Sequence, residues 1–264
     1  MNTLQNRNQT IDFLRNMTVL LLIPFHVSII FSLFGNFHIR NQETIYITTL
    51  LAKLLHPWMI PLLIMLAGIS MRHSMEHRSD LVFIKERLHR LLLPLLFGIL
   101  VIIPPQVFFE LKSQFNPGRI KAGYFSGSYL EFYTEFFQCC YPGGNLTYHH
   151  LWFLLYLFIY SLLMIPVFRI LISRTLITSD FSHKDLLGLT LVLFFIEFFL
   201  RPFFPNWQNF VSDWANHAHY LFLLYFGFHV WFTKNPTAYF VRNKNILLFI
   251  AAFTGLGYAF FPEK

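Results

Sequence analysis

Charged residues are scarce in this 264-residue chain, at 12% of the sequence, against roughly 25% in soluble domains. Six runs of at least 18 residues contain no Asp, Glu, Lys or Arg at all: 17–34, 54–71, 91–109, 136–168, 214–233 and 245–262. A seventh run, 186–200, is interrupted only by Glu197. Each long run is sufficient to cross a bilayer as a helix. A soluble fold is disfavoured because it would have to bury all of these runs at once.

Cysteine is also scarce, and the two that occur, Cys139 and Cys140, are neighbours. Adjacent cysteines suit disulfide geometry poorly, so we expect no disulfide framework. The chain has no Walker loop, no GxGxxG turn and no cysteine-pair metal motif. Its 12 histidines form no convincing pair of ligands on two helices. We therefore predict no metal ion and no permanently bound cofactor.

Hydrophobic residues, by contrast, make up 55% of the chain, and the mean hydropathy is +0.51. This pattern predicts an all-α, polytopic membrane bundle with about seven transmembrane helices, roughly over 12–34, 48–71, 91–110, 148–168, 186–203, 213–233 and 245–262. The sequence shows no internal repeat, no low-complexity linker and no sign of a second domain. We expect residues 1–264 to form one transmembrane domain.

The net charge of +7 indicates membrane orientation rather than nucleic-acid binding. Basic residues concentrate between the apolar runs, where they favour the cytoplasmic side. The strongest cluster is 72–90, predicted as a basic inner loop, with Arg72, Arg78, Lys85, Arg87 and Arg90. We therefore predict a cytoplasmic N-terminus, with the lipid bilayer as a partner and no nucleic acid.

One histidine, His26, lies inside the first apolar run. Arg15 precedes it by eleven residues, which is about three turns plus 20° of helix and about 16 Å. Asp12 falls within about 40° of the same face, although Pro24 can kink the helix. Ionisable groups at this depth usually face a cavity or a partner. His26 is either a buried histidine bonded to another helix or a general base with a pKa suited to neutral pH.

Arg87 and Arg90 are three residues apart, so a regular helix would place them on one face. Two guanidinium groups there could hold phosphates through forked hydrogen bonds. Their alternative role is ordinary anchoring of the helix on the cytoplasmic side.

His149, His150 and Trp152 mark the expected outer end of the fourth span. Trp152 is typical of the aromatic belt of a membrane protein. The two histidines could orient an acceptor hydroxyl, and a structural role is equally open.

Two further pairs occur at helical i, i+4 spacing. Glu197 and Arg201 predict an intramembrane ion pair. Asp213 and His217 are either a carboxylate that orients an imidazole or a helix cap. We regard all four as candidates on the acceptor side.

Together these residues resemble a known family. Arg15 and His26 match the Arg-(ten residues)-His motif of the bacterial acyltransferase-3 membrane family, and 87–90 matches its Arg-x-x-Arg motif. Residues 65–71 resemble its small-residue turn at the end of the second span. The stretches that resemble the glucan-biosynthesis protein C branch, associated with succinylation of periplasmic glucans, are 7–32, 91–110 and 149–156.

The resemblance implies a membrane O-acyltransferase of the bacterial inner membrane. It implies an acetyl or succinyl group taken from cytoplasmic acyl-CoA, a co-substrate, and passed to a hydroxyl of an extracytoplasmic glycan. It also implies His26 as general base or transient acyl carrier, with Asp12 and Arg15 beside it. Arg15, Arg87 and Arg90 would hold the donor.

The family usually has about ten spans, so the seven expected here predict a shortened member. One alternative is a catalytically inactive or truncated paralogue that assists glycan modification or export. A transporter with a polar path through Arg15, His26 and Glu197 is less favoured, because no paired broken helices are evident. The acyl group, the acceptor and the oligomeric state stay open.

Overall fold

The computed structural model describes residues 9–33, 41–112, 125–138, 140, 144–174, 180–206, 208–230, 233–234 and 236–260. Within these ranges the fold is helical, with two isolated bridges and no strand. The elements are α1 (Gln9–Ile30), α2 (Tyr46–His77), α3 (Asp80–Arg87), η1 (Leu88–Leu92), α4 (Leu93–Phe97), η2 (Gly98–Ile102), α5 (Ile103–Lys112), α6 (Tyr129–Phe136), η3 (His149–Leu151), α7 (Trp152–Leu163), α8 (Ile165–Ser173), α9 (His183–Phe199), α10 (Trp214–Val230), α11 (Pro236–Arg242) and α12 (Lys244–Phe260). Cys139, one of the two cysteines for which no disulfide was expected, lies outside the described residues. So do residues 113–124 of the long connection and residues 261–264.

The all-α membrane bundle predicted from the sequence is confirmed. Three continuous helices are long and apolar enough to cross a membrane: Gln9–Ile30, Tyr46–His77 and Asp80–Lys112. A fourth span results if α7 and α8, bent by 48° at their junction, are taken together. Helices α9, α10 and α12 coincide with the other predicted spans but have 17 residues each. That is about 26 Å against a hydrocarbon core of about 30 Å, so the count of seven stays a prediction.

The basic segment 72–90 was expected to be a loop, and this expectation is wrong. α2 continues to His77 and α3 begins at Asp80, so helix covers almost the whole segment. Some of its charges are paired within a helix, as where Arg72 contacts Glu76 at 2.5 Å. Because long basic side chains can extend to the interface from within a helix, a cluster of arginines need not mark a loop.

Residues 65–71 are helical as well, rather than a turn at the end of the second span. Their small residues serve a close crossing of α2 with α10. A Cβ on Gly68 would lie 2.1 Å from the Leu224 carbonyl oxygen, and one on Gly227 would lie 2.0 Å from that of Met65. Small residues at such crossings let two membrane helices bring their backbones together.

An aromatic core fills the space between α2, α7, α8 and α10. Phe168 stacks on Phe228 with ring centroids 3.7 Å apart, and Tyr156 and Tyr160 are fully buried. On the opposite faces, α1, α4, α9 and α12 expose large apolar side chains, such as Phe249 at 71%. Such surfaces suit contact with lipid tails.

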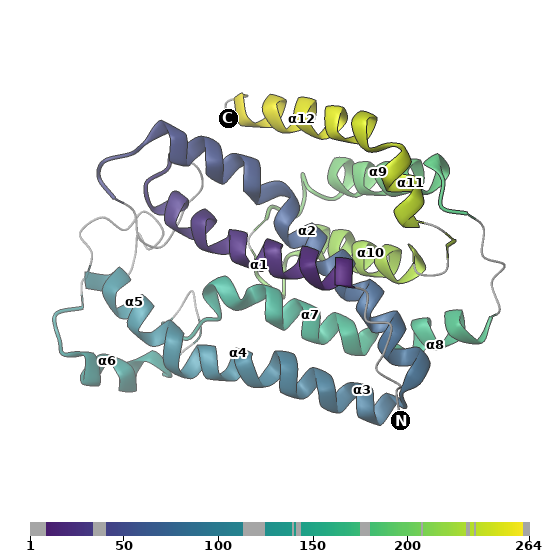
Figure 1. Ribbon diagram of the computed structural model, residues 1–264. Coiled ribbons are helices and arrows are strands. Elements are labelled where there is room, and N and C mark those ends of the chain that lie inside the picture. The colour runs from purple at the N-terminus through teal and green to yellow at the C-terminus, as the bar shows by residue number, and fades with distance from the viewer. Residues whose placement is uncertain are drawn as a thin grey trace.

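The helices run roughly alongside one another (Figure 1). The start of α1, the α2–α3 turn, α8 and α11 lie toward one end of the bundle, and α5 and α6 lie toward the other (Figure 1). Two features at opposite ends of α1 therefore occupy opposite ends of the molecule.

Helix α6 supports the end of α5. It begins with a capping box in which the Ser128 backbone N–H and hydroxyl donate to Glu131 at 2.7 and 2.9 Å. These hydrogen bonds hold the pKa of Glu131 below its usual range. Phe132 and Phe136 are fully buried in one cluster with Val107 and its neighbours on α5. The end of α5 is thereby fixed against a second helix.

Candidate functional site

Arg15 lies near the start of α1 and is held by two partners. Its guanidinium contacts Asp12 at 3.2 Å, as the shared helix face predicted. It also donates to the Ser70 hydroxyl of α2, which in turn donates to the Leu66 carbonyl at 2.9 Å. Arg15 is therefore fixed between two helices rather than extended freely.

Several arginines gather around Arg87, and we call them the arginine group: Arg15, Arg78, Arg87 and Arg90. The other three lie close enough to Arg87 to repel its charge, while Glu86 attracts it. Glu86 also contacts Arg78, and lies 3.6 Å from Arg90. Positive charge thus exceeds negative charge here, which suits an anion such as a phosphate.

The two arginines of the Arg-x-x-Arg motif have different surroundings. Arg87 is 8% exposed, and its guanidinium lies over the Phe83 ring, 4.7 Å from the centroid. The Arg90 side chain is 69% exposed. The segment Leu88–Leu92 is a π-helix, whose wider turns change the angle between residues. The two side chains of the pair therefore differ in exposure, and their shared helix face stays a prediction.

His26 lies about three turns further along α1 than Arg15. Its Nδ1 is 2.6 Å from the Leu22 carbonyl oxygen. A carbonyl only accepts hydrogen bonds, so Nδ1 carries the hydrogen and a neutral His26 has its lone pair on Nε2. The His26 ring also meets the His150 ring, with centroids 6.2 Å apart at 71°. Two predicted site residues from distant parts of the chain are thereby brought together.

His149, His150 and Leu151 form a short turn, which we call the histidine turn. The Nε2 of His149 lies 3.7 Å from the Glu110 carboxylate of α5, and both side chains are buried. Trp152, which follows, stacks on Tyr220 with centroids 5.7 Å apart. It is 7% exposed and belongs to the core of the bundle, so it is not a surface residue of an aromatic belt.

Glu197 and Arg201 form the ion pair that their spacing predicted, with bonds of 2.8 and 2.9 Å. His219 Nδ1 lies 2.9 Å from Glu197, and Arg201 donates to Asn216 at 2.7 Å. This network joins α9 to α10.

Asp213 and His217, also four residues apart, do not bond to each other through their side chains. Asp213 accepts from Tyr156 at 3.2 Å and from Asn216 at 2.6 Å. His217 Nδ1 lies 2.6 Å from the Tyr160 hydroxyl and Nε2 lies 2.7 Å from the Phe210 carbonyl. The Asp213 carboxylate therefore does not orient the His217 imidazole through a hydrogen bond. Asp213 directly precedes α10, and its backbone carbonyl accepts from the His217 N–H at 2.9 Å, so the helix-cap alternative stays open. Two tyrosines of α7 are therefore the hydrogen-bond partners of Asp213 and His217, which α10 alone could not provide.

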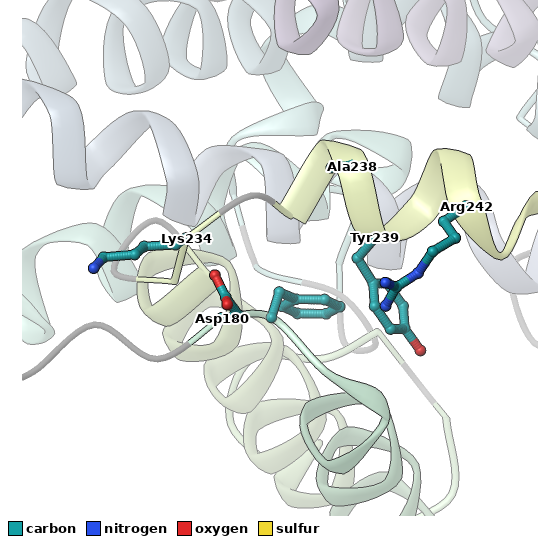
Figure 2. A pocket seen from close by; sticks show the side chains of 6 residues that line it. Asp180, Lys234, Ala238, Tyr239 and Arg242 are labelled. Atoms are coloured by element: carbon teal, nitrogen blue, oxygen red, sulfur yellow. The ribbon is translucent and has the colours of Figure 1, made fainter.

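A cavity of about 240 Å³ lies elsewhere, where α11 meets the segment that precedes α9. Figure 2 shows Asp180 and Lys234 on one side of it and Tyr239 and Arg242 on the other. None of the predicted site residues lines it. We place the candidate site on the buried polar contacts described above rather than in this open hollow.

Among the residues that the structure describes, no group of three or more His, Cys, Asp or Glu side chains could hold a metal ion. Two residues that contact the predicted site residues were not identified from the sequence: Ser70, which bonds to Arg15, and Glu110, which lies near His149. Ser70 gives no signal of its own, whereas Glu110 could have been noticed as a lone carboxylate directly after the uncharged run 91–109.

A family model described as "Acyltransferase domain" (Acyl_transf_3) matches residues 8–262. No curated protein and no solved structure matches the chain.

Proposed function

This chain belongs to the acyltransferase-3 family and is a membrane acyltransferase that moves groups other than aminoacyl groups, and we propose that its donor is cytoplasmic acyl-CoA and its acceptor a hydroxyl of an extracytoplasmic glycan. The transferred group is acetyl or succinyl. The resemblance to the glucan-biosynthesis branch favours a periplasmic glucan as acceptor, in the inner membrane of a bacterium.

The arginine group supports the donor half of the proposal. Arg15 is held by Ser70, and Arg87 is buried with excess positive charge around it. Among the described residues, the Nε of Arg87 has no hydrogen-bond acceptor. The phosphates of CoA supply both the negative charge and the acceptors that such guanidinium groups bind through forked hydrogen bonds. With the N-terminus cytoplasmic, these arginines face the compartment that contains acyl-CoA.

The observation that carries the proposal is the hydrogen bond from His26 to the Leu22 carbonyl. It leaves Nε2 as the basic atom of the neutral ring. In the proposed step Nε2 takes the proton from the acceptor hydroxyl while the oxygen attacks the thioester carbonyl. The C–S bond then breaks, the thiolate leaves and receives the proton from His26, and the acyl ester is released. A general base of this kind contributes about 10²–10⁴-fold.

Asp12 and Arg15 contact each other at the start of α1, about 21 and 16 Å respectively from His26 along the helix. They bind and balance the charged part of the donor in this proposal, while the acyl arm reaches toward His26. His150, which meets the His26 ring, orients the acceptor hydroxyl. Glu197, Arg201, Asp213 and His217 belong to the acceptor-side half of the bundle.

Complementation of a strain that lacks this gene tests the proposal. Wild type, His26→Ala and the control His77→Ala are expressed at equal levels, and mass spectrometry measures the acyl mass on surface and periplasmic glycans. His77 is a matched control because its Nδ1 also contacts the carbonyl four residues earlier, at 2.9 Å. We expect wild type and His77→Ala to restore the acyl group and His26→Ala to reduce it by about 10²-fold or more.

An equal acyl content in all three strains would show that His26 is a packing residue. If wild type restores nothing, the inactive-paralogue alternative replaces the proposal. The mass of the added group identifies the donor as acetyl-CoA or succinyl-CoA.

A further inference from the structure

We propose that Glu110 and His149 are a positioning pair that holds His150 against His26, an inference that rests on the proposed function. Their effect on the reaction would pass through the histidine turn.

Burial is the first argument for the pair. The side chains of His149 and Glu110 are 5% and 1% exposed, and the His149 Nε2 lies 3.7 Å from a Glu110 carboxylate oxygen. A buried carboxylate is costly unless it has a partner. An apolar side chain at either position would pack without that cost, so the pairing calls for a role other than filling space.

The backbone of His149 is the second argument. Its φ is 38°, in the left-handed region that residues other than glycine adopt uncommonly. Such strain persists only where surrounding contacts hold the residue, and it concentrates at functional sites. The contact with Glu110 is one of the interactions that hold it.

The rest of the turn is fixed from two more sides. A Cβ on Gly98 would lie 2.2 Å from the Leu151 side chain, so this glycine makes room for the turn against η2. On the other side, the Tyr148 hydroxyl accepts from the Phe210 N–H at 2.9 Å and donates to the Gln208 carbonyl at 3.1 Å. The turn is thus clamped between η2, α5 and the segment before α10.

The consequence of this clamp is the position of His150. Its ring meets the His26 ring with a centroid distance of 6.2 Å. A hydroxyl oxygen near both imidazoles can donate its hydrogen to one and accept from the other. Small errors in such an arrangement are costly, because a displacement of about 1 Å can lower a rate by about 10²-fold.

Steady-state kinetics on membranes from the complemented strain test the pair. The donor is radiolabelled acetyl-CoA or succinyl-CoA, chosen by the acyl mass found above, and labelled glycan is the readout. The variants are Glu110→Gln, His149→Gly, the double variant, His26→Ala and the control Glu135→Gln, an exposed carboxylate of α6. His149→Gly removes the imidazole and also relieves the left-handed backbone strain.

We expect Glu110→Gln and His149→Gly each to lower kcat by about tenfold or more, with the KM for acyl-CoA changed by less than about twofold. The double variant should be no slower than the worse single variant, because both lose the same interaction. His149→Gly relieves the backbone strain but also leaves the buried Glu110 carboxylate without its partner, so its melting temperature in detergent is measured and kcat is compared per folded molecule. A purely structural pair would instead lower the amount of folded protein and leave kcat per folded molecule unchanged.

Wild-type kcat in either single variant, or losses that multiply in the double variant, would overturn the inference. If Glu110→Gln does not accumulate, His149→Gly decides the matter alone, because its glycine suits the backbone. An active His26→Ala would instead overturn the proposed function. An inactive His26→Ala beside a fully active Glu110→Gln would overturn only the positioning pair.

Discussion

Arg15 reaches from α1 to the Ser70 hydroxyl of α2, while Asp12 contacts it from its own helix. The second helix therefore sets the direction of this guanidinium. An uncharged serine from the 65–71 stretch therefore helps to decide where a motif arginine points.

Replacing Ser70 with alanine should weaken donor binding while chemistry at His26 continues. The lost hydrogen bond to a charged group corresponds to about 1.5–3 kcal/mol in general, so we expect the KM for acyl-CoA to rise by roughly tenfold with kcat nearly unchanged. Thr190→Ala is the control, because that exposed hydroxyl bonds only to the Leu186 carbonyl of its own helix. A fall in kcat with constant KM would contradict the assignment of Arg15 to the donor.

At the scale of elements, the main feature is the close crossing of helices α2 and α10. Gly68 and Gly227 face the backbone of the opposite helix, and each leaves no space for a methyl group. The aromatic core packs around this crossing, with Phe228 one residue beyond Gly227. The crossing therefore sets the distance between the α1–α2 pair and the α7–α10 core.

Gly68→Ala and Gly227→Ala should each push the two helices apart and lower thermal stability in detergent. Overpacking of this kind costs about 1–3 kcal/mol. Gly188→Ala is the matched control, since a Cβ there would meet nothing within 4 Å. We expect it to be neutral or stabilising by up to about 1 kcal/mol, as alanine favours helix over glycine. Equal melting temperatures for all three variants would show that the crossing is not tight in solution.

At the scale of the whole molecule, the two ends of the bundle carry different chemistry. The arginine group lies with the start of α1 and the α2–α3 turn, and the histidine turn lies further along, past His26. The donor and acceptor of the proposed reaction would approach from these opposite ends. The orientation of the bundle in the membrane is therefore part of the mechanism.

Cysteine labelling tests that orientation. In a background with Cys139 and Cys140 replaced by serine, His77→Cys and Leu130→Cys place one thiol at each end of the bundle; both native side chains are exposed. We expect a membrane-impermeant maleimide to label Leu130→Cys in spheroplasts and His77→Cys only after lysis. The reverse pattern would place the arginine group outside and remove the cytoplasmic donor from the proposal.

The sequence by itself determined the helical membrane bundle, because apolar runs of 18 residues or more are long enough to cross a bilayer as helices, which satisfy their own backbone hydrogen bonds in lipid. It also determined the Glu197–Arg201 pair, because side chains four residues apart on a helix are neighbours. It did not determine the helical course of 72–90 or the different exposure of Arg87 and Arg90, since both depend on how the side chains pack.

Only the tertiary structure decided which distant residues meet. Ser70 with Arg15, Glu110 with His149 and His26 with His150 are contacts between helices far apart in the chain. The same holds for Asp213 and His217, whose partners Tyr156 and Tyr160 come from α7. The physical reason is that helical periodicity follows from backbone geometry alone, whereas the choice of partner depends on how the helices pack.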